Sequence, residues 1–377
     1  MKKILIINSS RQPAQTLKEL FQGLTEKGFF LRILSTQDKI LKQFSGDKVF
    51  TRKIFLGPKI NNSSGAFFFF LLLPLLLFRH LFSLIYLKYK HKVVDVVCFS
   101  WNEKIVFTPL AKILRLKIIW VEKPSLNYIR ASKFTIRLLK SLAVNTKIIV
   151  FTRDTRKKLE KLNFGKANIK NISPGLKTDF LKYQENIFSD LAKNFDSYSS
   201  QKYFTVGVIN DLHKIHQLKN IFRALKLCLD SFRDIRLVII GEGKEKKQVS
   251  WLAQQTEVEN YVYLMGKQNY SGRWWENFDV YLTATNKFKL KNFDILLKAM
   301  FASLPVIAFQ GEGVEEVVKN KKNGLLIPAG NPEILAEKII KLKKDESLRK
   351  KLGEKGKKTV EENFLFKEQL ERLSQEL

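Results

Sequence analysis

Cysteine is scarce in this sequence, since only Cys98 and Cys228 occur among 377 residues. Each lies inside an apolar stretch and neither belongs to a Cys-x-x-Cys pair, which excludes a disulfide framework. We interpret both as small core residues of a protein kept in a reducing compartment. The apolar part of residues 1–8 is too short for a signal peptide and is typical of a first buried strand, so a cytoplasmic location is expected.

Histidine is also scarce, with four residues. His213 and His216 have the i, i+3 spacing of metal ligands on a helix, but the sequence offers them no third ligand. Zinc-finger spacing is absent as well. We therefore predict no metal site.

Acidic residues are fewer than basic ones: the sequence has 36 Asp and Glu and 67 Lys and Arg, so the net charge is +31. Such a balance indicates a polyanionic partner, which can be nucleic acid, anionic lipid or a phosphorylated small molecule. Nucleic-acid binders concentrate their charge on one face or module. Here Lys and Arg occur in nearly every block of ten, and no basic-zipper or single-strand motif is present. We therefore expect no nucleic acid and keep the anionic membrane surface and phosphorylated ligands.

One long hydrophobic run stands out. Residues 66–78 are wholly apolar, and after Arg79 and His80 the run continues to residue 87. The uninterrupted part is shorter than the roughly 20 residues of a spanning helix, Pro74 lies inside it, and lysines follow it. Two interpretations remain open: a buried helix of a first domain, or an interfacial helix with its Phe and Leu side chains in a lipid leaflet. Both can hold, because a kinked helix can bury one face and present the other.

Short apolar runs alternate with longer helix-like segments throughout, which is the pattern of βαβ units and parallel sheets. Between residues 184 and 202 the composition changes to Asn, Asp, Ser, Gln and Lys, so we place a linker there. This predicts an N-terminal domain at 1–183 that contains the apolar helix 66–87, and a second domain at 203–360. A final helix at 361–377 either continues the second domain or crosses back to the first. Strands are predicted at 3–8, 28–35, 93–99, 117–121, 147–151, 203–209, 236–240, 261–265, 280–284 and 305–309, and helices at 16–27, 105–114, 216–229, 245–255 and 293–302.

The second half carries a series of short motifs in a characteristic order. An apolar strand ends in Gly241-Glu242-Gly243, a later one reads Leu304-Pro305-Val306-Ile307-Ala308, and residues 323–328 read Asn-Gly-Leu-Leu-Ile-Pro. Together with 206–209, 261–266, 279–285 and 311–317, these resemble the donor domain of family 4 glycosyltransferases. Residues 150–152 and 172–180 extend the resemblance, less specifically, into the first half.

The resemblance implies an α/β protein of the GT-B fold, with two doubly wound Rossmann-like domains facing across a crevice. It further implies a retaining glycosyltransferase that moves a sugar from a nucleotide-sugar to a lipid-linked or cell-envelope glycan. Combined with the basic charge and the apolar run, this predicts a cytoplasmic protein that is peripheral at the inner face of the membrane. No metal or other cofactor is expected, because helix N-termini and nearby cations can hold a diphosphate.

The resemblance also indicates site residues. Glu122, after a predicted strand, is the candidate catalytic or acceptor-side carboxylate, and the alternative is a surface ion pair with Lys123. Gly241 and Gly243 either line the nucleotide cleft or form a strand-to-helix turn that needs glycine. The full set of candidate donor-binding residues is Lys214, Lys219, Gly241, Gly243, Thr285, Lys298, Gly313 and Glu316.

The acidic signature of the family is missing. Its two glutamates, eight positions apart, correspond here to Lys298 and to Leu290, or to Phe288 or Lys289 if the preceding loop is longer. Val208 stands where the family has an arginine. Lys298 is either a phosphate ligand or a solvated helix lysine. Two functions therefore compete: an active enzyme with altered donor contacts, and a catalytically decayed GT-B module that acts in binding or as a scaffold.

Overall fold

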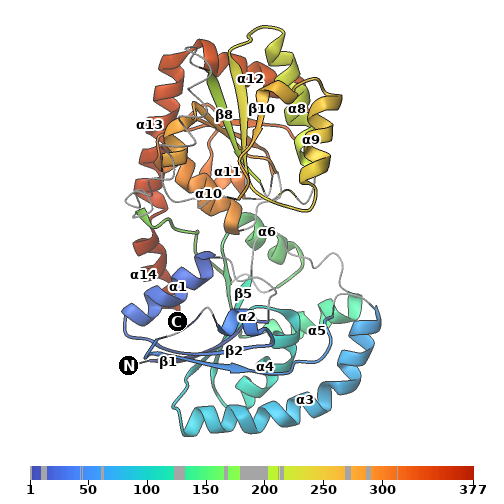
Figure 1. Ribbon diagram of the computed structural model, residues 1–377. Helices are drawn as coiled ribbons and strands as arrows, with labels where there is room; N and C mark the ends of the chain where they lie inside the picture. Colours follow the sequence, from blue (N-terminus) through green and yellow to red (C-terminus); the bar gives the residue numbers. More distant parts are fainter. Residues whose placement is uncertain are drawn as a thin grey trace. The chain divides into compact units, whose positions relative to one another are not determined.

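The chain forms two compact units (Figure 1). Unit 1 comprises Met1–Pro174, Lys289–Lys291 and Glu368–Leu377, and unit 2 comprises Gly175–Phe288 and Asn292–Lys367. The computed structural model describes residues 2–9, 15–42, 44, 46–60, 63–122, 132–164, 169–178, 203–210, 212, 216–267, 273–285, 290–311 and 313–377. The predicted linker at 184–202 lies outside these residues.

Unit 1 is built on a seven-stranded sheet in the order β3-β2-β1-β4-β5-β6-β7, in which every neighbouring pair is parallel. Its central strands are almost purely apolar, as expected for a parallel sheet that is covered on both faces. The strands are β1 (Lys3–Ile7), β2 (Phe30–Ser35), β3 (Val49–Lys53), β4 (Asp95–Cys98), β5 (Lys117–Glu122), β6 (Lys147–Val150) and β7 (Ile169–Asn171).

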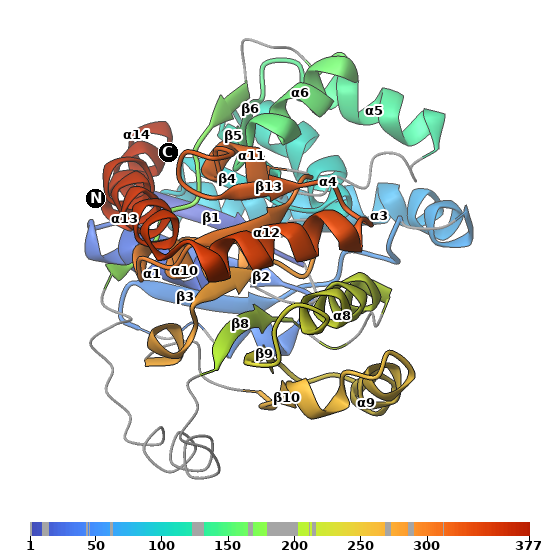
Figure 2. The same ribbon diagram turned by 90° about the horizontal axis from the view of Figure 1, so that it is seen from above.

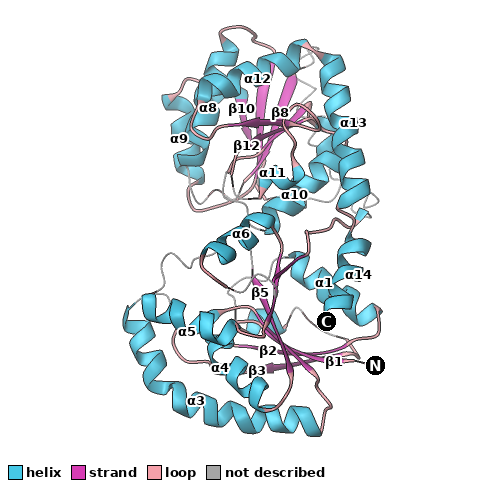
Figure 3. Ribbon diagram, turned by 180° about the vertical axis from the view of Figure 1, so that it is seen from behind, coloured by secondary structure: helices cyan, strands magenta, loops and turns pink. Residues whose placement is uncertain are grey.

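The helices of unit 1 cover both faces of this sheet. In Figures 1 and 3, α3, α4 and α5 lie on one face and α1 lies on the other. This division follows from right-handed crossovers that run in opposite directions from β1 and from β4. The helices are α1 (Gln15–Glu26), α2 (Asp38–Leu41), α3 (Ser63–Tyr89), α4 (Trp101–Ile113), α5 (Lys133–Ala143) and α6 (Arg153–Lys161).

Unit 2 repeats the doubly wound plan with a six-stranded parallel sheet in the order β10-β9-β8-β11-β12-β13. Helices α8 and α12 pack against each other on one face, as Figure 2 shows. The strands are β8 (Phe204–Ile209), β9 (Ile235–Ile240), β10 (Val262–Leu264), β11 (Val280–Leu282), β12 (Val306–Phe309) and β13 (Leu325–Ile327). The helices are α8 (His216–Leu229), α9 (Lys246–Gln255), α10 (Leu290–Phe301), α11 (Val314–Val317), α12 (Pro332–Lys344) and α13 (Glu346–Asn363).

The long apolar run forms the single helix α3, which continues through Pro74. One side of the helix belongs to the core of unit 1 through residues such as Leu76 and Leu84. The buried His80 donates a hydrogen bond from its Nε2 to the carbonyl of Phe55, 2.9 Å away, and burial lowers its pKa. The other side of α3 is exposed and apolar. Within the described residues, α3 alone has the length and hydrophobicity that a membrane span requires.

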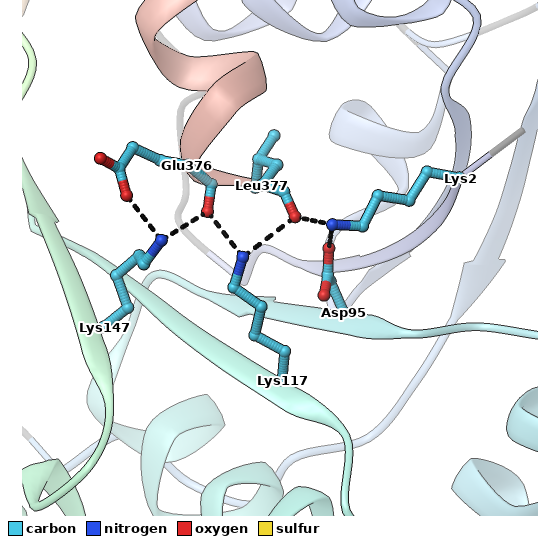
Figure 4. Close-up of polar contacts among 6 residues, drawn as sticks. All are labelled: Lys2, Asp95, Lys117, Lys147, Glu376 and Leu377. Atoms are coloured by element: carbon cyan, nitrogen blue, oxygen red, sulfur yellow. Dashed lines mark hydrogen bonds and ion pairs between the residues drawn. The ribbon is translucent and has the colours of Figure 1, made fainter.

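The last helix, α14 (Phe366–Glu376), ends against the strand edge of unit 1 (Figure 4). The Lys117 ammonium donates to the carbonyl oxygens of Glu376 and Leu377, at 2.9 and 3.1 Å. Lys147 donates to the carboxylate of Glu376 at 2.5 Å, which lowers the pKa of that carboxyl. Lys2 donates to the carbonyl of Leu377 and forms an ion pair with buried Asp95 at 2.8 Å. These cations satisfy carbonyls at the negative end of the helix dipole.

Candidate functional site

The carboxyl edge of the unit 2 sheet contains most of the predicted donor residues. The strand order reverses between β8 and β11, and ligands of doubly wound sheets bind outside the carboxyl ends of strands at such a switch point. Thr283 lies there, directly after β11, and its hydroxyl accepts a 3.1 Å hydrogen bond from the Phe309 amide at the end of β12. This bond fixes two adjacent strand ends, so the loops that follow them start from a rigid edge.

Gly241 and Gly243 follow β9 and pack against the backbone of the loop after β8. A Cβ atom on Gly241 would lie 1.8 Å from the Asn210 carbonyl oxygen, and one on Gly243 would lie 2.1 Å from that of Leu212. The Gly241 amide also donates to the carbonyl of Gly266 at 2.8 Å. Close contact between neighbouring loops therefore explains both glycines, which supports the turn interpretation of the sequence motif.

The other donor candidates lie on neighbouring elements of the same unit. Lys219 is exposed in the first turn of α8, and Thr285 follows β11. Gly313 adopts a left-handed conformation, with φ of 81°, immediately before α11, which contains Glu316. Since α8 and α11 follow β8 and β12, Lys219, Gly313 and Glu316 all come after the carboxyl ends of these strands. Lys214 lies outside the described residues, as do His213 and the alternative glutamate positions Phe288 and Lys289.

Lys298 is partly buried rather than fully solvated. Its ammonium forms an ion pair with the carboxylate of Asp294, 3.0 Å away, and the two side chains are only 16% and 21% exposed. The pair spans one turn of α10, which begins at Leu290, three residues before the predicted start. Leu290 itself is buried. Sequence reasoning missed Asp294, although its position four residues before Lys298 on a helix is a signal for such a pair.

The switch point of the unit 1 sheet, between β1 and β4, holds a buried polar network. The carboxylate of Glu103 on α4 is fully buried and accepts hydrogen bonds from the amides of Ser9 at 2.5 Å, Phe99 at 2.6 Å and Ser100 at 2.9 Å. The hydroxyl of Ser9 also donates to this carboxylate and lies 2.8 Å from that of Ser100. Glu103 therefore joins the end of β1 to the turn between β4 and α4.

Glu122 is buried rather than at the surface, and Lys123, its alternative partner in the sequence analysis, lies outside the described residues. At the end of β5, the Glu122 carboxylate pairs instead with Lys104 of α4, and the side chains are 6% and 0% exposed. The Lys104 ammonium also lies 5.3 Å from the centre of the Trp120 ring. The pair is thus a buried connection between α4 and the sheet.

Both cysteines are buried, as predicted for core residues. Burial and the nearby Glu103 carboxylate raise the pKa of the Cys98 thiol well above its usual range. Burial raises the pKa of Cys228 to about 12. Both thiols are therefore neutral and unreactive near pH 7. Among the residues that the structure describes, no group of three His, Cys, Asp or Glu side chains has the arrangement of a metal site.

Comparison with known proteins identifies the second half of the chain. Residues 192–359 match the family model of glycosyl transferases group 1. N-acetyl-alpha-D-glucosaminyl L-malate synthase of Bacillus anthracis is 27% identical over 157 residues, which are 41% of this chain and 40% of that protein. Poly(ribitol-phosphate) alpha-N-acetylglucosaminyltransferase of Staphylococcus aureus (strain COL) is 24% identical over 193 residues, which are 50% and 38% of the two chains. The chain therefore matches about two fifths of the length of either relative.

The fold extends over the whole chain. The structure of HepE from Anabaena in complex with UDP has a TM-score of 0.79 and 16% identity, and covers 100% of this chain and 99% of that one. The predicted α/β fold is thereby confirmed. Residues 192–359 are thus similar to the glycosyl transferases group 1 family, and the chain has the GT-B fold.

Proposed function

We propose that this protein is a glycosyltransferase that moves a sugar from a nucleotide-sugar to a lipid-linked or cell-envelope glycan. The observation that carries the proposal is the family match, which covers the unit 2 sheet and the glycine-containing loops at its carboxyl edge. The Staphylococcus relative is named for transfer to poly(ribitol-phosphate), and the Anabaena structure holds UDP. A phosphate-rich acceptor suits a chain with a net charge of +31.

On the donor side, we assign the diphosphate to the N-terminus of α8 and to Lys219 in its first turn. Helix N-termini present unpaired amides and a positive dipole end, which together bind phosphate. Asp294 supplies the carboxylate for the donor hydroxyls, because Lys298 cannot accept hydrogen bonds while it is charged. The ion pair with Lys298 orients the Asp294 carboxylate. Thr285, Gly313 and Glu316 then border the donor from the neighbouring loops.

In the transfer, an acceptor hydroxyl oxygen bonds to the anomeric carbon while the bond from that carbon to the diphosphate breaks. The diphosphate leaves with the electron pair, so its negative charge grows as the reaction proceeds, and the cations and amides of unit 2 stabilise it. Glu122 is held by Lys104 and is nearly inaccessible. We therefore assign it a structural role at the acceptor-side unit rather than proton transfer.

The test is donor hydrolysis and nucleotide binding with a panel of UDP-, GDP- and ADP-sugars. We expect the wild type to hydrolyse at least one of them, also in the presence of EDTA, since no metal is assigned to the site. Asp294→Asn should lower the rate about tenfold, which is the value of one hydrogen bond to a charged group. Asp230→Asn, which alters an exposed carboxylate of the same unit, should leave the rate unchanged. Failure to bind any nucleotide-sugar would instead support the decayed GT-B module.

The exposed face of α3 supports a peripheral position on an anionic membrane. Its apolar residues recur three or four positions apart and so form one stripe along the helix. Lys88 in the last turn of the helix and Lys90 and Lys92 just beyond it supply cations for lipid headgroups. The stripe consists of Phe67, Leu71, Leu75, Phe78, Phe82, Tyr86 and Tyr89.

Vesicle cosedimentation tests this face. The double variant Leu71→Ser, Phe78→Ser should lower partitioning onto vesicles with phosphatidylglycerol about 30-fold, because each side chain loses roughly 1 kcal/mol of burial in lipid. Trp251→Ser, Leu227→Ser removes two exposed apolar side chains from unit 2 and should have no effect. Equal partitioning of the two variants would show that the stripe does not bind lipid.

A further inference from the structure

An open cavity of ≈ 780 Å³ lies at the amino edge of the unit 1 sheet. Lys117 and Lys147 are the first residues of β5 and β6, so the cavity lies at the opposite sheet edge from Glu103 and Glu122. Five of its ten lining residues are cationic and none is acidic. The cationic residues are Lys112, Arg115, Lys117, Lys147 and Lys170.

The cations around the cavity are only partly neutralised. Lys112 donates to the carbonyls of Leu142 and Val144 at 2.8 and 2.6 Å, so it is fixed by dipoles rather than by a carboxylate. Lys117 likewise donates to carbonyls at the end of α14. Two carboxylates act on this group, namely Glu376, which pairs with Lys147, and Asp95, whose charge favours the charged form of Lys117. Arg115 and Lys170 are exposed.

Like charges are crowded here. Burial, and after it the neighbouring Lys147, lower the pKa of Lys117, and burial also lowers the pKa of Lys112. A cluster of ammonium groups in a concave surface concentrates positive potential inside it. An anion that entered would stabilise the charged form of each lysine.

We propose that this cavity binds a phosphate-bearing anion. The planar guanidinium of Arg115 suits two phosphate oxygens at once, and the lysines act as point charges around it. Two sources share this chemistry, namely a free phosphate compound and the headgroup of an anionic lipid. The second is within reach because Lys88, in the last turn of α3, donates to the carbonyl of Leu114 at 2.8 Å, one residue before Arg115. The proposal is independent of the glycosyl-transfer function, since the cavity belongs to unit 1 and the donor loops belong to unit 2.

The experiment compares two charge-reversal variants of the full chain. Arg115→Glu, Lys170→Glu alters the cavity but leaves the lysines that hold α14. Lys351→Glu, Lys355→Glu makes the same change in net charge on exposed positions of α13. Binding of inorganic pyrophosphate is measured by calorimetry, and partitioning onto vesicles with and without phosphatidylglycerol by cosedimentation, at low salt and at 0.5 M salt.

The proposal predicts that the cavity variant loses at least tenfold in pyrophosphate affinity, in anionic-vesicle partitioning, or in both, while the α13 variant matches the wild type. Loss of pyrophosphate affinity identifies a free phosphate compound as the ligand. Loss of vesicle partitioning alone identifies the headgroup of an anionic lipid. The proposal is overturned if the wild type binds neither probe, or if both variants behave alike in both assays. Nucleotide-sugar hydrolysis by the cavity variant should be unchanged, so this result is separable from the donor-site test.

Discussion

The Lys104→Met substitution should lower the free energy of unfolding of unit 1 by roughly 3–5 kcal/mol. Methionine fills nearly the same volume as lysine, but it leaves the Glu122 carboxylate buried without the cation that now compensates it. Removing one partner of a buried ion pair destabilises the fold much more than removing both. The remaining charge is then desolvated and has no opposite charge to compensate it. Hydrogen exchange of the β4 and β5 amides measures this loss within unit 1 alone.

Two further variants make the result interpretable. Lys104→Met, Glu122→Leu removes both charges and should recover most of the lost stability. Lys350→Met breaks the exposed i, i+4 pair with Glu346 and should cost less than about 1 kcal/mol. Exchange rates in Lys104→Met that match those of Lys350→Met would contradict a structural role for the buried pair.

The Gly241→Ala variant should lose donor hydrolysis about 100-fold. Its new Cβ atom would meet the Asn210 carbonyl at 1.8 Å, and φ is 154° at this residue, a conformation that side chains rarely adopt. The loops after β8 and β9 must therefore separate, and displacements of about 1 Å in a donor site cost on the order of 10² in rate.

The matched control is Gly356→Ala in α13, where a Cβ atom would be 3.4 Å from its nearest neighbour, an ordinary contact. This variant should keep full activity, because alanine favours a helix by about 1 kcal/mol over glycine. Circular dichroism distinguishes a displaced loop from an unfolded unit. Gly241→Ala activity within threefold of the wild type would disprove the importance of this loop contact.

Periodicity and motif order predicted the fold well, because both depend on local sequence. Strand and helix boundaries mostly agree within one to three residues, but α4 begins at Trp101 rather than at residue 105. The missed signal was Ser100-x-x-Glu103, a capping-box pattern that also identifies the buried Glu103. The edge strand β3 was missed because Val49–Lys53 is half polar and only partly buried.

The site was less predictable than the fold, since its partners depend on tertiary packing. Nothing near Glu122 in the sequence indicates that Lys104, eighteen positions earlier, is its partner. A helix must first pack on the sheet before the two side chains meet. The same applies to Lys117 and Lys147, whose amino-edge positions follow only from the strand order. Lys298 and Asp294, by contrast, are one helical turn apart and were within reach of sequence reasoning.

The contacts at the end of α14 also bear on how the chain is made. Lys2, Lys117 and Lys147 belong to the first part of the chain to be synthesised, but their acceptors are Glu376 and Leu377. During vectorial synthesis, domains generally fold from the N-terminus onwards. Unit 1 can form its sheet early and Lys2 can pair with Asp95 at once, yet Lys117 and Lys147 reach their acceptors at the end of α14 only after unit 2 has been synthesised. Maturation of the first unit is therefore completed after synthesis of the second.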